Sequence, residues 1–296
     1  MFFQFSFAIL LVQSSFAQLP PLFEEFYQQR GKTLYSSLIV YKETQTTSIF
    51  SFTILNDRGD TVKGRIRTPK NAKGKFPLAF LVVGVETGKE VVNMIEGTDS
   101  VIVAAIDYPS MSPWDFSDWN AIKTAFTVRD NAYKTVPQLL LCLEWLFRHP
   151  LVDVSDVTVV AVSFGVFTAV PTTVIEKRIK QLVLIQAGGN MYDIVKANAE
   201  RLQIPLPTWL AGMVGNWMYS EFEPNDYIGL LSPRPVLLVN GESDVLFPRS
   251  SVQSLFEHAK EPKEWIQHKS KHIMPGDQET INELTMIVTE KLYGKK

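Results

Sequence analysis

Five short apolar runs constrain the fold of this chain more than any other feature of its sequence. Each run is rich in Val, Ile and Leu and shows no alternation of apolar and polar residues, so both faces of such a strand must be buried. Helices on both sides of a parallel sheet provide that burial, which predicts an α/β fold. The runs lie at residues 77–84, 101–107, 157–162, 181–187 and 235–240.

Helical patterns separate or follow these runs, as the connections of a parallel sheet require. Residues 136–150 carry apolar side chains on one face at helical spacing, and Pro137 either opens or kinks this helix. Residues 249–259 and 278–292 predict two more helices. The segment at about 189–226 fits no strand and predicts a short helical cap inserted into one domain.

The chain reaches the parallel strands through a different pattern. Residues 48–69 predict two antiparallel strands that are joined by the turn NDRGD. In the second strand Lys63, Arg65 and Arg67 alternate with apolar residues or glycine. This period of two predicts a strand with one face toward water.

Composition and charge exclude several classes of partner. Of the 296 residues 46% are hydrophobic and 20% are charged, which is the balance of a globular protein with a substantial core. A net charge of -2 gives no concentrated basic face for a nucleic acid. We therefore expect a small-molecule partner. The single cysteine, Cys142, lies in an apolar run and is expected in the core, with no intrachain disulfide.

The first residues resemble an export signal. Residues 1–17 combine an apolar stretch with small residues before Gln18, where a signal peptidase could cut. We expect a signal peptide at 1–17, a domain at 18–296, and an exported protein that is periplasmic or secreted. The stretch lacks the usual basic residue, so an uncleaved, membrane-associated start is the alternative. No apolar stretch reaches the ~20 residues of a spanning helix, so no stable membrane insertion is expected.

The strand at 157–162 leads into the best candidate for a nucleophile. Ser163 follows this strand and precedes an apolar helix that is expected to begin at Phe164. A sharp turn between strand and helix needs small residues two positions before and after the serine, and these are Ala161 and Gly165. The motif is short, and a serine beside a glycine after a strand is also common in ordinary structural turns.

A serine needs an adjacent base, and histidine has a suitable pKa. His149 would lie at the opposite end of the sheet, His258 falls in a surface helix, and His268 ends a short strand. His272 lies in the loop before the last helix, from which it can reach the carboxyl ends of the strands. We therefore assign His272 as the base.

A carboxylate must orient the base and stabilise its charged form. Asp244 follows the strand at 235–240 and is our candidate, with Glu242 in the same loop as the rival. The order Ser163, Asp244, His272 along the chain is the order of α/β-hydrolases.

A tetrahedral intermediate also needs hydrogen-bond donors for its oxyanion. The backbone amides of Phe164 and of Val85, in the glycine-containing loop after the first parallel strand, are the candidates. The residues that would bind the rest of a substrate could not be named from the sequence.

With these residues, the chain resembles the dienelactone hydrolase-like branch of the α/β-hydrolases, which is similar to acetyl xylan esterases. The resemblance spans about 47–293 and is carried by LEWLFRHPLVDVSDVTVVAVSFG and LSPRPVLLVNGESDVLFP. It implies a mostly parallel, eight-stranded sheet, an acyl-enzyme mechanism, and no metal or organic cofactor. The chain departs from that branch at Ala161, at Lys271 in place of a glycine, and in lacking a His-Gly pair in the oxyanion loop.

The leading hypothesis is a serine carboxylic ester hydrolase acting on a small-molecule ester. Three alternatives stay open: a non-catalytic binding protein of the same fold, a serine peptidase of the same fold, and a lipase with an exposed apolar cap surface. Aromatic and apolar residues in the loop at 108–119 and in the predicted cap could form an apolar wall over the site. In the cap these residues are Trp209, Met213, Trp217 and Tyr219.

Overall fold

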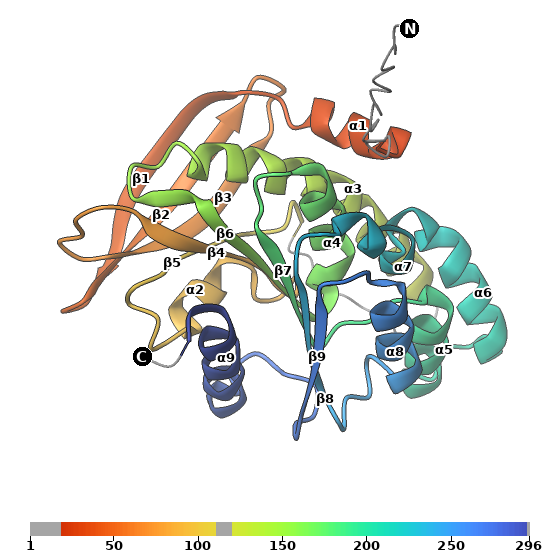
Figure 1. Ribbon diagram of the computed structural model, residues 1–296. Helices are drawn as coiled ribbons and strands as arrows, with labels where there is room; N and C mark the ends of the chain where they lie inside the picture. Colours follow the sequence, from red (N-terminus) through yellow and green to blue (C-terminus); the bar gives the residue numbers. More distant parts are fainter. Residues whose placement is uncertain (1–18, 111–119, 295–296) are drawn as a thin grey trace, which may run out of the picture.

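One twisted sheet lies at the centre of the computed structural model, which describes residues 19–110 and 120–294 (Figure 1). In these ranges the sheet has nine strands in the order β1-β2-β3-β5-β4-β6-β7-β8-β9. Strands β4 to β9 pair in parallel, whereas β1, β2 and β3 pair antiparallel and β3 joins β5 antiparallel. The strands are β1 (Thr33–Glu43), β2 (Thr47–Asn56), β3 (Thr61–Pro69), β4 (Phe76–Val82), β5 (Ile102–Ile106), β6 (Val152–Val162), β7 (Gln181–Ile185), β8 (Val236–Gly241) and β9 (Lys263–His268).

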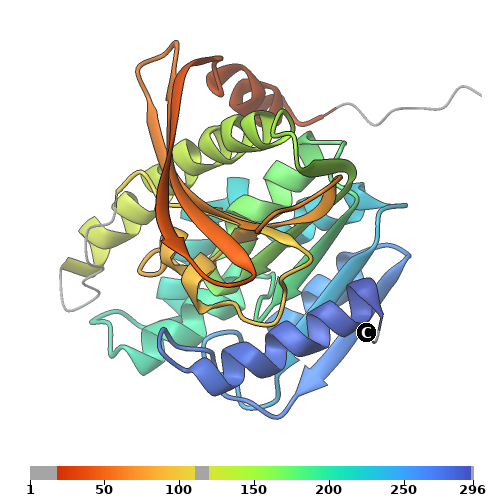
Figure 2. The same cartoon turned by 90° about the vertical axis from the view of Figure 1, so that its left-hand side faces the viewer.

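The mostly parallel α/β sheet is confirmed, but it has nine strands where eight were expected. The additional strand is β1, which lies at the edge of the sheet and pairs only with β2 (Figure 2). Most of its side chains are exposed, including those of Leu34, Ile39 and Tyr41. Because neither face of β1 is buried, its sequence carries no alternation that would reveal a strand.

Helices cover both faces of the sheet. Helices α1, α3, α4 and α8 pack on one face, and α2 and α9 pack on the other. The helices are α1 (Pro21–Gln29), α2 (Val91–Met94), α3 (Asn120–Leu146), α4 (Val166–Ile175), α5 (Met191–Arg201), α6 (Thr208–Tyr219), α7 (Pro224–Ile228), α8 (Arg249–His258) and α9 (Gln278–Tyr293). Four 3-10 turns are η1 (Gly88–Glu90), η2 (Ser163–Gly165), η3 (Ser220–Phe222) and η4 (Gly229–Leu231). Pro137 lies inside α3, so it does not open a helix.

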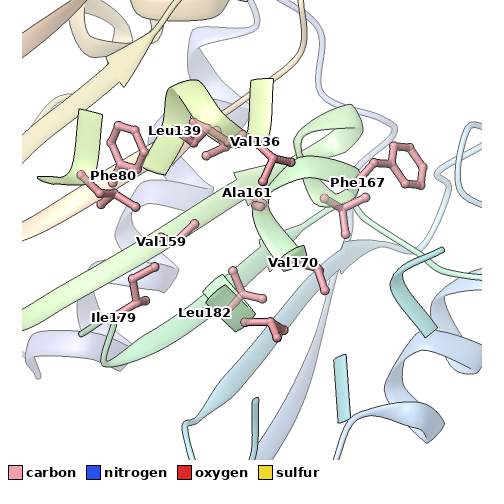
Figure 3. Packing of buried hydrophobic residues seen from close by; sticks show 14 of the residues in the cluster. Phe80, Val136, Leu139, Val159, Ala161, Phe167, Val170, Ile179 and Leu182 are labelled. Carbon is pink, nitrogen blue, oxygen red and sulfur yellow. The ribbon is translucent and has the colours of Figure 1, made fainter. Parts of the chain in front are cut away.

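The larger core lies between the sheet and helices α3 and α4 (Figure 3). Strand side chains such as Phe80 and Val159 meet helix side chains such as Leu139 and Val170 there. Cys142 belongs to this cluster, and burial raises the pKa of its thiol. Each fully buried apolar side chain contributes on the order of 1.5–3 kcal/mol to folding, so this core holds β6 and α4 firmly against each other.

The expectation that β3 has one face in water holds at Lys63, which is exposed, but is wrong further along the strand. Arg65 and Arg67 are both buried, because the segment that includes η1 and α2 covers this face. Arg65 forms an ion pair with Glu90, and Arg67 donates hydrogen bonds to the carbonyl of Ile95 and to the hydroxyl of Thr98. Burial lowers the pKa of Arg67.

The segment predicted as a cap, 189–226, joins β7 to β8 through helices α5 and α6, η3 and most of α7. Figure 1 shows α5 and α6 side by side, next to α7 and α8, and α5 and α6 pack against each other. The predicted signal peptide at 1–17 lies outside the described residues.

Candidate active site

Ser163 occupies a strained turn between β6 and α4. Its φ angle is 54°, in the left-handed region that costs energy for a residue with a side chain. A Cβ atom at Gly165 would overlap the carbonyl oxygen of Val82, so only glycine fits there. The α-helix begins at Val166 rather than at Phe164, because η2 completes the turn first. This tight geometry presents the serine hydroxyl at the carboxyl edge of the sheet.

The structure brings the three predicted side chains together at that edge. Ser163 follows β6, Asp244 follows β8 and His272 follows β9. Ser163 Oγ lies 2.8 Å from His272 Nε2, and His272 Nδ1 lies 2.8 Å from Asp244 Oδ2. Both distances are those of good hydrogen bonds. The three residues therefore form one continuous hydrogen-bonded chain.

The structure distinguishes Asp244 from its rival. The Asp244 side chain is 1% exposed, and its Oδ1 accepts hydrogen bonds from the backbone amides of Leu246 at 2.8 Å and Phe247 at 3.1 Å. These bonds leave Oδ2 directed at His272. Glu242 is exposed, and no hydrogen bond joins its carboxylate to His272. The aspartate is thus buried, oriented and satisfied at both oxygens.

His272 is held from several sides. Its side chain is 7% exposed, and the Phe247 ring stacks on it with centroids 5.9 Å apart. The other three histidines lie elsewhere. His149 precedes the start of β6, at the end of the strand opposite Ser163, and His258 is the exposed last residue of α8. His268 ends β9 and contacts Glu283.

Sequence reasoning missed Gln186, which holds the loop of His272. Gln186 directly follows β7, is fully buried and has a φ angle of 48°. Its amide nitrogen donates to the Lys271 carbonyl at 2.7 Å and contacts Ser270 Oγ at 3.1 Å. Its amide oxygen accepts from the backbone amide of Ile273. One glutamine therefore binds the residues on both sides of His272. A polar residue at the end of an apolar strand was the only signal for it in the sequence.

The loop that follows β4 carries Val85, the second residue predicted as an oxyanion donor. Val85 is buried beside the site, and its amide has no hydrogen-bond acceptor in the described part of the chain. Tyr108 anchors the start of the loop, because its hydroxyl donates to the carbonyl of Val83 at 2.6 Å. Burial raises the pKa of Tyr108, so this hydroxyl keeps its proton at neutral pH. Phe164 lines the same cavity.

A cavity of about 860 Å³ opens in front of Ser163 and His272. Its described lining is mostly apolar and comes from α2, α3, α5, α6 and α9 as well as from the strand ends. This volume is in the upper part of the range of ~300–1,000 Å³ that is typical of small-molecule sites. The site can therefore hold a molecule that is much larger than its reacting group.

The predicted apolar wall is only partly correct. Trp217 and Tyr219 line the cavity, although Trp217 is 74% exposed. Trp209 and Met213 are also more than half exposed, but they do not line the cavity. These two side chains are on the outer face of α6, because α5 packs against its inner face. Residues 111–119, which were also predicted to form part of this wall, lie outside the described residues.

Solved structures with a similar fold were found across almost the whole chain. An acetyl xylan esterase from Paenibacillus sp. R4 matches with a TM-score of 0.67 and 16% identity, covering 91% of this chain and 92% of that chain. Acetyl xylan esterase 1 from Thermoanaerobacterium sp. JW/SL YS485 matches with a TM-score of 0.63 and 16% identity, covering 93% of this chain and 94% of that chain. The chain has the α/β-hydrolase fold.

A cold-adapted esterase from an Arctic intertidal metagenomic library shares this α/β-hydrolase fold, with a TM-score of 0.57 and 16% identity over 85% of this chain and 96% of that chain. The family model "Serine hydrolase (FSH1)" matches residues 194–284, a segment that contains Asp244 and His272. No curated protein matches the chain. The family model describes serine hydrolases, and the names of the three structural neighbours describe those proteins as esterases.

Within 19–110 and 120–294, no three His, Cys, Asp or Glu residues are arranged to hold a metal ion. None of the helices in these ranges is both long and apolar enough to cross a membrane.

Proposed function

We propose that this chain is a serine hydrolase that cleaves carboxylic esters through an acyl-enzyme intermediate. The observation that carries the proposal is the continuous hydrogen-bonded chain of Ser163, His272 and Asp244. It supports the nucleophile, the base and the orienting acid in one geometry. The esterase neighbours and the serine hydrolase family model support the same reaction class.

The proposed reaction begins when His272 Nε2 removes the proton from Ser163 Oγ. The serine oxygen then attacks the ester carbonyl, and Asp244 stabilises the imidazolium that forms. Collapse of the tetrahedral intermediate breaks the bond to the alcohol oxygen, which leaves with the proton from His272. Water, deprotonated by the same histidine, then releases the acid and restores Ser163.

The oxyanion of each tetrahedral intermediate would accept hydrogen bonds from the amides of Phe164 and Val85. The unpaired amide of Val85 supports this role, because a buried N–H without an acceptor is costly unless a ligand satisfies it. A preformed donor needs no reorganisation when charge develops, and one such donor contributes about 2.7–4 kcal/mol to the transition state.

The test combines turnover with active-site labelling. The protein should hydrolyse p-nitrophenyl esters and react covalently with a fluorophosphonate probe, and Ser163→Ala should abolish both. Ser155→Ala is a matched control, because Ser155 is exposed near the opposite end of β6. Absence of both activities in the folded wild-type protein would contradict the proposal and favour a binding protein. Labelling of Ser163 with cleavage of peptide but not ester substrates would favour a peptidase.

A further inference from the structure

The cavity at Ser163 extends across the carboxyl edge of the sheet and reaches both of its faces. On β6 and β7, Val162 and Ile185 point into the core on the α2–α9 face and line the cavity. Phe167 of α4 and Met191 of α5 belong to the core on the opposite face and line the same cavity. Ser163 lies on the edge between these two sets of residues. The cavity therefore has an arm on each side of the nucleophile.

The first arm, here called the α2–α9 arm, is closed by apolar side chains from both helices. Val91 and the neighbouring Ile95 line it from the α2 side. Ile281 and Leu284 line it from α9, and Thr285 is half-buried beside them. No charged side chain of α2 or α9 lines the cavity.

The second arm, here called the α3–α6 arm, lies between α3 and the helices α5 and α6. Val128 of α3, Ile194 of α5 and Ala211 of α6 line it. Asn198 is a polar residue in this lining, but its amide nitrogen already donates to the carbonyls of Ile194 and Leu246, both at 2.9 Å. The side-chain amide of Asn198 therefore already donates two hydrogen bonds within the protein.

Charge is confined to the rim of the cavity. The charged residues in the described lining are Glu86 and Arg201, and both are exposed. Burying a hydroxyl or a charge without a hydrogen-bond partner is strongly unfavourable. A sugar or a charged head group in either arm would lose its hydration and gain few partners. An alkyl or aromatic group would gain from leaving water.

We propose that the substrate is an ester that is apolar on both sides of the scissile bond, with the acyl group in one arm and the alcohol group in the other. This inference rests on the proposed ester hydrolase function. The proposed substrate differs from the acetylated xylan in the names of two structural neighbours. An acetyl group would fill little of a cavity of about 860 Å³, and xylan is a sugar polymer.

The first experiment varies the two halves of the ester independently. The acyl series is p-nitrophenyl acetate, butyrate, hexanoate and octanoate, and the alcohol series is methyl, hexyl, glucose and choline octanoate. We expect kcat/KM to rise roughly threefold to fourfold for each buried methylene in the acyl series. The kcat/KM for hexyl octanoate should be at least about tenfold higher than for glucose octanoate or choline octanoate, because the polar groups of the latter two esters would be buried without partners. Preference for acetate, or for the sugar ester, would overturn the proposal.

Two substitutions then narrow the arms one at a time. Thr285→Phe would fill the α2–α9 arm, and Ala125→Phe would fill the α3–α6 arm, since both residues are half-buried in the cavity lining. Met286→Phe and Lys123→Phe are matched controls, because these neighbours are exposed and do not line the cavity. One narrowing variant should shorten the preferred acyl group and the other should shorten the preferred alcohol. If Thr285→Phe and Ala125→Phe both changed the preference for the same half of the ester and left the other half unaffected, the two-arm assignment would be contradicted.

A binding measurement separates failure of this inference from failure of the proposed function. Ser163→Ala cannot turn over substrate but keeps the cavity, so it should bind hexyl octanoate more tightly than glucose octanoate in calorimetry. Fluorophosphonate labelling of wild-type Ser163 together with preference for small polar esters would retain the hydrolase and overturn the apolar substrate. Without labelling or turnover the hydrolase proposal fails, and the apolar ester is rejected as its substrate.

Discussion

The side-chain amide of Gln186 donates a hydrogen bond to the backbone carbonyl of Lys271, at 2.7 Å, immediately before His272. The same side chain accepts a hydrogen bond from the amide of Ile273, immediately after His272. Gln186 directly follows β7, an interior strand of the sheet, and it fixes a loop that otherwise has little regular structure. We regard Gln186 as a positioning residue for the histidine.

Replacing Gln186 with leucine should therefore impair turnover more than binding. Leucine removes all three hydrogen bonds from Gln186 to the histidine loop, and displacement of a reacting group by about 1 Å costs on the order of a hundredfold in rate. We expect kcat to fall by about that factor while KM changes little, measured on a p-nitrophenyl ester. The rate of fluorophosphonate labelling should fall in parallel.

Gln181→Leu provides the matched control for this effect. Gln181 begins the same strand, and its amide bonds Thr158 Oγ1 at 2.9 Å, far along the strand from His272. This variant should retain near wild-type kcat. An equal loss of kcat in both variants would indicate general damage to β7 and would contradict the positioning role.

The two carboxylates in the loop after β8 should respond differently to amide substitution. Asp244→Asn keeps the shape of the buried side chain but disrupts the preferred tautomer of His272, a change that costs about ten-thousandfold in kcat in the serine-protease triad. Glu242→Gln, at an exposed position two residues away, should remain near wild type. Steady-state kinetics with a p-nitrophenyl ester tests both variants. The assignment of the acid is wrong if Glu242→Gln is the more damaging change.

Gly165→Ala should destabilise the turn that presents Ser163. The added methyl group would overlap the carbonyl oxygen of Val82, which belongs to a central strand and cannot move freely. Overpacking of this kind costs about 1–3 kcal/mol, and we expect the upper end in the free energy of unfolding measured by urea denaturation. Gly84→Ala has open space around its new methyl group and should be close to neutral for stability. Equal stability of the two variants would show that the turn tolerates a side chain.

Tyr108→Phe should weaken both stability and catalysis through the loop after β4. The substitution leaves the buried carbonyl of Val83 without its donor, at a cost of about 1–3 kcal/mol in the free energy of unfolding. A less firmly held loop should also lower kcat, because the proposed oxyanion donor Val85 follows Val83 closely. Tyr35→Phe removes a hydroxyl from an exposed side chain and is the matched control. Unchanged stability and kcat in Tyr108→Phe would exclude this anchoring role.

Much of the fold could be predicted because each parallel strand is recognisable from its own short stretch of sequence. A run of apolar residues without alternation signals a strand that is buried on both faces, wherever its partners are in the chain. The edge strand β1 lacked such a signal, since its side chains are exposed on both faces. The burial of Arg65 and Arg67 was also missed, because it depends on a covering segment more than twenty residues further along the chain.

The sequence by itself determined the mostly parallel α/β sheet, and its residue order named Ser163, Asp244 and His272 as candidates whose catalytic roles stay predictions. Only the tertiary structure decided that Asp244 and not Glu242 reaches His272, that Gln186 holds the histidine loop, and that one apolar cavity spans both faces of the sheet. The physical reason is that these relationships join side chains from different strand ends and helices, and their directions depend on how the layers pack. Local residue patterns record which side chains must be buried, whereas the packed layers decide which of them meet.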